Sequence, residues 1–401
     1  AAFYERNPHS LEDAKELYGD LARVGVTRLE RFAACAYAHF LTYGLRLSER
    51  EIYQFEAMDL GNVAHQSMER FSRKADERRV DWTEMPEDLR ARLIEESVEE
   101  SILEYGNTVL YSSARNEYLI TRIKQLIRRS VWALTKQMEQ GDFRPRGYEI
   151  KFGGGKIDRV DTCEDESRVY VKVTDYKTGM KSFDITSFYH GLQLQLPVYL
   201  NAAMELEERK AERENGKADT GYGGGADVRK DVVPAGVFYY RIHDPIVERE
   251  DDERVVEQKI LKELKLDGLM SADERVLSHL QHDVEGTSAF LPFGRNKDGS
   301  LSKFSKVLSA EEFALFLEYT KKKERELKGR MAAGEAAASP YELDGRTACD
   351  YCAYRAVCGF DARISGCGYR ELEKYTREEV MGKIREEMDG NAVDRGTEKG
   401  N

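Results

Sequence analysis

The chain has 401 residues, which at about 150 residues per domain is enough for roughly two to three domains. Hydrophobic residues make up 41% and charged residues 34%, so a packed core is expected and a wholly disordered chain is excluded. The net charge of −12 argues against a protein that coats nucleic acid non-specifically, while a local basic channel stays compatible with it. The sequence has neither a secretory signal nor an apolar run near the roughly 18 residues of a membrane span, so we expect a cytoplasmic protein that does not enter a membrane.

The apolar periodicity predicts a mixed α/β fold with helices at both ends of the chain. Helices are expected first, with Thr27 as an N-cap, over residues 11–25, 26–47, a stretch from 59, 87–105 and 115–139. Strands follow at 148–152, 156–161 and 168–177, with a hairpin turn at 164–167. The remaining elements are a helix at 184–206, an exposed charged loop at 207–230, a strand at 232–242, a helix at 309–334 and a disordered tail from 391.

Three of the six cysteines form a C-x2-C-x5-C motif near one end of the chain, at Cys349, Cys352 and Cys358. Without a secretory signal, this spacing favours a metal or cluster site over disulfides, and a four-coordinate site still lacks one ligand. Cys35, in FAACAYAHF, is the candidate for that ligand and would join the two ends of the chain. Spacing alone leaves open a zinc site, a cluster or unrelated thiols, with Cys35 as a small buried residue.

A carboxylate and an ammonium lie together at the end of the strand RVYVKVTDYKTG. Because strand side chains alternate, Asp175 and Lys177 share a face with three valines. The preceding strand, GKIDRVD, brings Asp158 toward Asp175 if the two strands form a hairpin. Two carboxylates are the ligands that Mg²⁺ or Mn²⁺ prefers, and a lysine beside such an ion can orient water or hold charge on a phosphate. D-x-K alone also fits an exposed surface pair of little energetic value.

The next helix adds two polar residues in QLQLPVY. Gln195 and Tyr199 are four residues apart, so they lie on one helix face, where they can hydrogen-bond a sugar–phosphate chain or a metal-bound water. Taken singly, they are equally compatible with a helix surface.

These motifs together resemble a known enzyme family. GKIDRVD, VTDYKTG and QLQLPVY resemble the RecB-like branch of the PD-(D/E)XK nucleases, and Gly61-Asn-Val-Ala-His65 resembles the G-x-x-x-H element of that branch. The combination of Cys35 with CDYCAYRAVCGFD is narrower and resembles the iron–sulfur nuclease domains of AddB-type helicase–nuclease subunits. The resemblance runs from about residue 26 to 361 and implies a restriction-endonuclease-like sheet flanked by helices.

The resemblance also implies roles for individual residues. The Mg²⁺ (or Mn²⁺) ligands would be His65, Asp158, Asp175 and the backbone carbonyl of Tyr176. Lys177 would be the catalytic lysine, supported by Gln195 and Tyr199. A [4Fe–4S] cluster would clip the N- and C-terminal segments together through Cys35, Cys349, Cys352 and Cys358. Cys163 and Cys367 match no ligand position and are interpreted as ordinary thiols, and a helix histidine paired with Glu69 is the plainer interpretation of His65.

The domain boundaries follow from the same resemblance. We expect a helical lead-in over 1–25, the nuclease domain over 26–365, and a C-terminal helix with a disordered tail over 366–401. The sequence departs from the family where the strand from Glu149 to Phe152 runs through three glycines directly into Lys156. Either this loop is short, or residues are missing from the sequence here, in which case Glu149 loses a firm place. No G-x-x-x-x-G-K-[ST] motif occurs, because Gly155-Lys156 is followed by Ile157, so no P-loop ATPase is expected in this chain.

The implied function is a DNA exonuclease that hydrolyses 5′-ended single strands beside an AddA-type partner in double-strand-break repair and recombination. One alternative is a stand-alone iron–sulfur exonuclease like those of CRISPR adaptation, and another is a non-catalytic DNA-binding scaffold held by the cluster. Residues 115–146 carry eight basic and three acidic side chains, with Arg122, Arg129 and Lys136 spaced seven apart on one helix stripe. That stripe predicts a DNA-binding surface or, equally, a solvated helix face.

Overall fold

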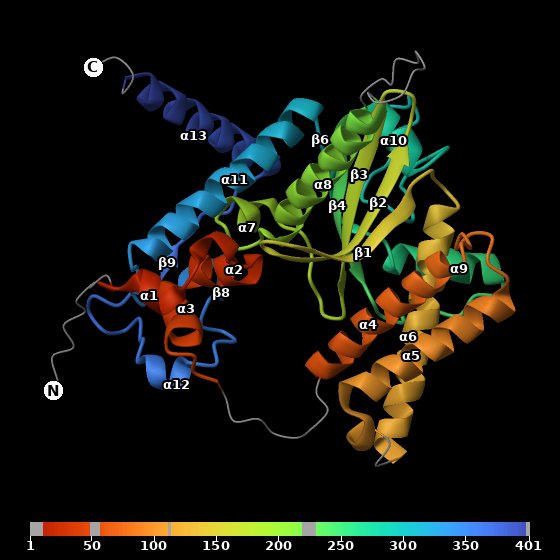
Figure 1. Ribbon diagram of the computed structural model, residues 1–401, viewed down its shortest axis with the longest axis horizontal. Helices are drawn as coiled ribbons and strands as arrows, with labels where there is room; N and C mark the ends of the chain where they lie inside the picture. The colour runs from red at the N-terminus through yellow and green to blue at the C-terminus, as the bar shows by residue number, and fades with distance from the viewer. Residues whose placement is uncertain (1–10, 49–56, 111–113, 219–229, 398–401) are drawn as a thin grey trace.

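The computed structural model describes residues 11–48, 57–110, 114–218 and 230–397 (Figure 1). Its centre is a mixed sheet with the strand order β1-β2-β3-β4-β5-β6. The pairs β1/β2, β2/β3 and β4/β5 are antiparallel, and β3/β4 and β5/β6 are parallel. The strands are β1 (Arg144–Phe152), β2 (Gly155–Glu164), β3 (Arg168–Lys177), β4 (Asp231–Arg241), β5 (Asp267–Ser271) and β6 (Val307–Leu308).

Helices cover both faces of this sheet, as the α/β prediction requires. The first part of the chain forms α1 (Ala14–Tyr18), a 3₁₀ turn (Leu21–Arg23), α2 (Val26–Ala34), α3 (Ala36–His39), a π turn (Phe40–Gly44), α4 (Ala57–Glu77), α5 (Glu87–Leu110) and α6 (Ala114–Met138). After the hairpins come α7 (Ile185–Tyr189), α8 (Gln195–Ala218), α9 (Glu253–Glu263), α10 (Glu274–Leu280), α11 (Ala310–Ala332), α12 (Arg355–Cys358) and α13 (Arg377–Thr397). A small second sheet has the order β8-β7-β9, with β7 (Tyr341–Leu343), β8 (Arg346–Thr347) and β9 (Arg370–Glu371).

The sheet separates two hydrophobic cores. One core joins the sheet to α4, α5, α6 and α10, and it receives Tyr170 and Tyr176 from β3. The other joins it to α2, α8, α11 and α13, and it receives Val171 and Val173 from the same strand. Alternate residues of β3 therefore enter opposite cores, which is the pattern of a strand buried on both faces.

The N-terminal helices and the segment that carries α12 meet on one side of the molecule. In Figure 1, α1–α3 lie beside α11 and the segment that carries α12. The amide of Tyr37 donates to the carbonyl of Ala337 at 3.1 Å, and the hydroxyl of Tyr354 donates to the carbonyl of Leu47 at 2.9 Å. The expected joining of the N- and C-terminal segments is therefore present as packing and hydrogen bonding.

Several predicted boundaries were wrong, each for a physical reason. The helix expected over 26–47 breaks at Cys35, which has an extended backbone (φ −163°, ψ 116°), and its N-cap is Gly25 instead of Thr27. The helix expected over 184–206 is interrupted between α7 and α8, because Gly191 has φ +79° and Pro197 is favourable only in a first helical turn. The lead-in expected as helix over 11–25 contains only α1 and a 3₁₀ turn.

Two segments are more helical than expected. The charged run from 207, predicted as a loop to 230, continues α8 to Ala218, with ion pairs such as Lys210 to Glu207 along it; residues 219–229 lie outside the described residues. The tail predicted as disordered from 391 belongs to α13 as far as Thr397, and residues 398–401 lie outside the described residues. In the part of the chain that the structure describes, no helix combines the length and apolar character that a membrane crossing requires.

Candidate active site

Two buried carboxylates face each other across the β2/β3 hairpin. Arg159 pairs with Thr174 in the antiparallel register, which places Asp158 opposite Asp175. Their residues are 8% and 1% exposed. Asp158 Oδ2 accepts a hydrogen bond from the backbone amide of Tyr176 at 2.8 Å, so the main chain fixes this carboxylate beside its neighbour. The approach of the two carboxylates that the sequence predicted is confirmed.

Helix α4 brings an imidazole to the same place. His65 Nδ1 lies 3.2 Å from Asp158 Oδ2. Burial opposes the charged form of His65, but the hydrogen bond that its Nδ1–H donates to Asp158, together with the negative charge of that carboxylate, raises the pKa of His65. One turn earlier, a Cβ on Gly61 would approach Thr178 Oγ1 to 2.9 Å, so glycine allows α4 to lie close against the end of β3. Glu69, the partner in the plainer interpretation, pairs with Arg73 at 2.8 Å instead.

Lys177 lies beside Asp175 as the strand alternation predicted. Its ammonium is 2.5 Å from Asp175 Oδ2 and 5.7 Å from the ring centroid of Tyr239. Burial raises the pKa of Asp175 to about 6, and the nearby Asp158 adds to this, while Lys177 and His65 oppose it. Because the ionised form of Asp175 is disfavoured in this way, a further positive charge nearby would stabilise it.

Helix α8 supplies the polar residues that support Asp175. Gln195 Nε2 donates to Asp175 Oδ1 at 2.8 Å and to the hydroxyl of Tyr199 at 3.0 Å. Both side chains therefore belong to the site instead of a free helix surface. Burial, with the negative charges of the site, raises the pKa of Tyr199 above its usual range, so its hydroxyl stays protonated.

Sequence reasoning missed Glu30, which holds α8 in place. Its Oε1 accepts from the backbone amides of Leu194 and Gln195, at 2.7 and 2.9 Å. These amides lie at the start of α8, where backbone donors have no partner within the helix. The only signal in the sequence was an acidic residue among the buried apolar positions Leu29 and Phe32 of α2.

The structure places Glu149, whose position the sequence left open, next to the carboxylate site. Strand β1 runs to Phe152 and turns tightly into β2 at Gly155, so the short connection of the sequence is a hairpin. Glu149 forms an ion pair with Lys156, and its backbone is in the left-handed region (φ +50°). Burial raises its pKa, and Asp158 contributes in the same direction, so its carboxylate lies in the field of the site.

The donor set fits a divalent cation. Two carboxylates, from the neighbouring strands β2 and β3, lie beside the imidazole of His65. The carboxylates are the hard oxygen ligands that Mg²⁺ or Mn²⁺ prefers, and the imidazole is an additional nitrogen donor. Asp175 Oδ2 is buried, and its close neighbour is the Lys177 ammonium at 2.5 Å. A bound cation would relieve the repulsion between the two carboxylates that remains beside this ion pair.

The four motif cysteines also come together. They line one cavity of about 480 Å³, where Tyr369 and Arg355 contribute to the wall. Burial raises the pKa of the Cys349 thiol, and the other three thiols add to this, so their charges interact. Cys163 and Cys367 are not among the described residues that line this cavity. The four thiols are Cys35 after α2, Cys349, Cys352, and Cys358 in α12.

The basic stripe on α6 is partly neutralised by acidic neighbours. Arg129 pairs with Asp244 at 3.1 Å, and Lys136 pairs with Glu139 at 2.9 Å. Arg122 is exposed. DNA binding by these three residues stays a prediction, as do the catalytic and ligand roles of the residues above.

Comparison with known proteins identifies the family of this chain. The family model described as the PD-(D/E)XK nuclease superfamily matches residues 23–359. The whole chain aligns at 38% identity with 35% of an ATP-dependent helicase/deoxyribonuclease subunit from Lachnoclostridium phytofermentans. Proteins of the same name from Alkaliphilus oremlandii and Caldanaerobacter subterraneus subsp. tengcongensis are each 34% identical, over 94% and 96% of this chain and 33% and 34% of their own length.

The chain thus spans about a third of the length of these relatives. The matched residues 23–359 contain the whole central sheet and every residue of the carboxylate site. On this match, and with a mixed sheet flanked by helices, the chain belongs to the PD-(D/E)XK nuclease superfamily.

Proposed function

We propose that this chain is a metal-dependent deoxyribonuclease domain that hydrolyses phosphodiesters of single-stranded DNA at Asp158, Asp175 and Lys177. The observation that carries the proposal is the buried pair of carboxylates with an ammonium 2.5 Å from one of them. A domain that only binds DNA has no need to bury two facing carboxylates, because each costs desolvation energy and repels the phosphate backbone.

The contacts of each site residue support a specific role in hydrolysis. Asp158, Asp175, His65 and the carbonyl of Tyr176 would hold Mg²⁺ or Mn²⁺, which supplies Lewis-acid activation of a water and of the phosphoryl oxygen. The Lys177 ammonium, which lies beside Asp175, would orient the attacking water and stabilise charge that develops on the phosphate. Gln195 fixes the orientation of Asp175 through Oδ1 and leaves Oδ2 facing Lys177.

The wider context is proposed from the relatives. Three of them are named as ATP-dependent helicase/deoxyribonuclease subunits, a name that denotes a part of a larger assembly. We propose that this domain acts in such an AddB-type protein beside an AddA-type partner, on 5′-ended single strands during double-strand-break repair in the cytoplasm. The four cysteines would hold a [4Fe–4S] cluster that staples the two ends of the domain; their shared cavity and all-thiol donor set support this.

A nuclease assay tests the proposal. Single-stranded DNA labelled at either the 5′ or the 3′ end is incubated with the cluster-loaded chain and Mg²⁺, and the rate is compared with that of Asp175→Asn. The exposed Glu166→Gln, in the β2/β3 turn, removes one negative charge elsewhere and is the matched control.

We expect cleavage by the unaltered chain and by Glu166→Gln, and a loss of at least about 100-fold in Asp175→Asn and with chelator. Equal rates for Asp175→Asn and the unaltered chain would show that the site is wrong. Absence of cleavage by the unaltered chain, with and without an AddA-type partner, would favour the scaffold alternative.

A further inference from the structure

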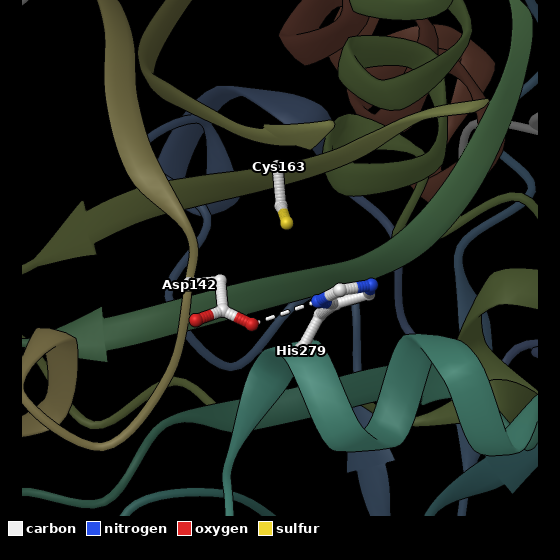
Figure 2. Close-up of side chains that lie close together, drawn as sticks. All are labelled: Asp142, Cys163 and His279. Atoms are coloured by element: carbon white, nitrogen blue, oxygen red, sulfur yellow. Dashed lines mark hydrogen bonds and ion pairs between the residues drawn. The ribbon is translucent and has the colours of Figure 1, made fainter. Parts of the chain in front are cut away.

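A second group of metal-ligand side chains lies on the other side of the sheet from the carboxylate pair. Asp142 comes from the turn before β1, Cys163 from β2 and His279 from α10 (Figure 2). Cys163 is five residues beyond Asp158 on β2, which corresponds to roughly 16 Å at about 3.3 Å per residue. Its partner His279 comes from α10, a helix that supplies no residue to the carboxylate site, so the group is separate from the active site.

The three side chains converge on a small volume. One ligand atom from each of Asp142, Cys163 and His279 lies within 4.8 Å of the others. Figure 2 shows the sulfur of Cys163 directed toward the carboxylate and imidazole below it. Asp142 Oδ2 is 2.7 Å from His279 Nδ1, and its other oxygen is 3.1 Å from His282 Nε2.

The main chain holds this group firmly. The amide of Asp142 donates to the carbonyl of His279 at 2.8 Å, and the amide of His282 donates to the carbonyl of Gln140 at 2.7 Å. A Cβ on Gly141 would lie 2.6 Å from the His279 carbonyl, so only glycine permits this close approach. Because these contacts fix both backbones, the ligand atoms need little rearrangement to bind an ion.

The chemistry of the donors selects a class of ion. A thiolate, an imidazole and a carboxylate are the ligand types of Zn²⁺, whereas Mg²⁺ and Ca²⁺ prefer oxygen alone. Three protein ligands leave a fourth position open, as in zinc sites that also bind water. A hydrogen-bonded His–Asp–His group without metal accounts for the contacts of Asp142 alone, whereas a metal site also accounts for the cysteine sulfur that lies beside it.

We propose that Asp142, Cys163 and His279 form a binding site for Zn²⁺ or a closely similar divalent ion, with His282 orienting Asp142. The ion would link three separate parts of the chain: the turn before β1, strand β2 and helix α10. Its role would be to fix α10 against the outer strands of the sheet, independently of the nuclease site and of the four-cysteine cavity.

Zinc content of the full, cluster-loaded chain tests this site. The protein is equilibrated with a slight excess of Zn²⁺ in the presence of Mg²⁺, separated from free metal, and analysed by mass spectrometry for zinc per chain. Cys163→Ser, Asp142→Asn and His279→Ala are compared with Cys367→Ser, which removes a cysteine outside all three proposed metal sites. Asp142→Asn keeps the shape of the side chain, which limits the risk that a variant fails to fold.

We expect one zinc per chain in the unaltered protein and in Cys367→Ser that is lost in all three ligand variants. His282→Ala is expected to weaken binding by roughly 10–100-fold, the effect of removing an orienting partner. X-ray absorption at the zinc edge should show one sulfur at about 2.3 Å. Equal zinc in the unaltered chain and the ligand variants, or a zinc without a sulfur neighbour, would overturn the proposal.

Discussion

The carboxylate site and the four-cysteine site are built in opposite ways. Asp158, Asp175 and Lys177 lie on two strands joined by a tight hairpin, so their proximity follows from local register. Cys35 and Cys349 lie near opposite ends of the chain and meet only when the whole domain has folded. Residues of the first site can therefore be replaced without loss of structure, whereas loss of the second site should destabilise the whole domain.

The largest expected effect on stability comes from breaking the cysteine site. We expect Cys352→Ser to lose the cluster and to lower the free energy of unfolding by about 2–5 kcal/mol, as removal of a covalent staple does. Thermal unfolding and visible absorption of the cluster, measured on anaerobically prepared protein, check this. Cys367→Ser is the control and should match the unaltered chain; equal melting temperatures for both variants would contradict a stapling role.

A smaller effect is expected at the link between the two regions. Glu30 in α2, close to Cys35 in sequence, holds the first amides of α8 and thereby Gln195. Glu30→Ala should lower the single-turnover rate of cleavage by roughly 10–100-fold through misplacement of Gln195. Glu30→Gln retains an acceptor oxygen and should restore most of the rate. If the alanine variant cleaves as fast as the unaltered chain, Gln195 does not depend on this cap.

The smallest expected effect is a loss of folding stability at acidic pH, and it arises at His39, near Cys35. Buried His39 accepts a hydrogen bond from Arg28 at 2.9 Å, and burial, with the positive charge of Arg28 and Arg31, lowers its pKa to about 3. As the pH falls below about 6.5, His39 becomes protonated in the unfolded chain while it stays neutral in the folded chain. The free energy of unfolding therefore decreases, by about 2 kcal/mol at pH 5.

Denaturant unfolding of the unaltered chain and His39→Gln across this pH range measures the effect. The variant should show a flatter dependence on pH, because glutamine accepts the Arg28 hydrogen bond without titrating. Identical pH profiles would mean that His39 is not held neutral by the fold.

The sequence was most informative where structure is local. The alternation of β3 and the spacing to Asp158 predicted the carboxylate pair, because the register of a short hairpin brings fixed residues together. The family resemblance supplied His65 and Cys35, which residue patterns alone left open.

Contacts between distant segments were not predictable from patterns. Glu30 accepts a hydrogen bond from the amide of Gln195, which is 165 residues later in the chain. Asp142 and His279 are 137 residues apart and come together only because α10 packs beside the turn before β1. The run 207–218 was predicted as loop from its charge, but it consists mainly of good helix formers that pair along α8. Charge alone does not distinguish an exposed helix from a loop.

The most direct test of the central claim is a single-turnover cleavage assay on Lys177→Met, with cluster content and DNA affinity measured on the same sample. If hydrolysis depends on Lys177 at the carboxylate site, cleavage should fall by at least about 100-fold while the cluster and the melting temperature are unchanged and DNA still binds. Cleavage at the rate of the unaltered chain would contradict the account, because the chemistry would then occur elsewhere.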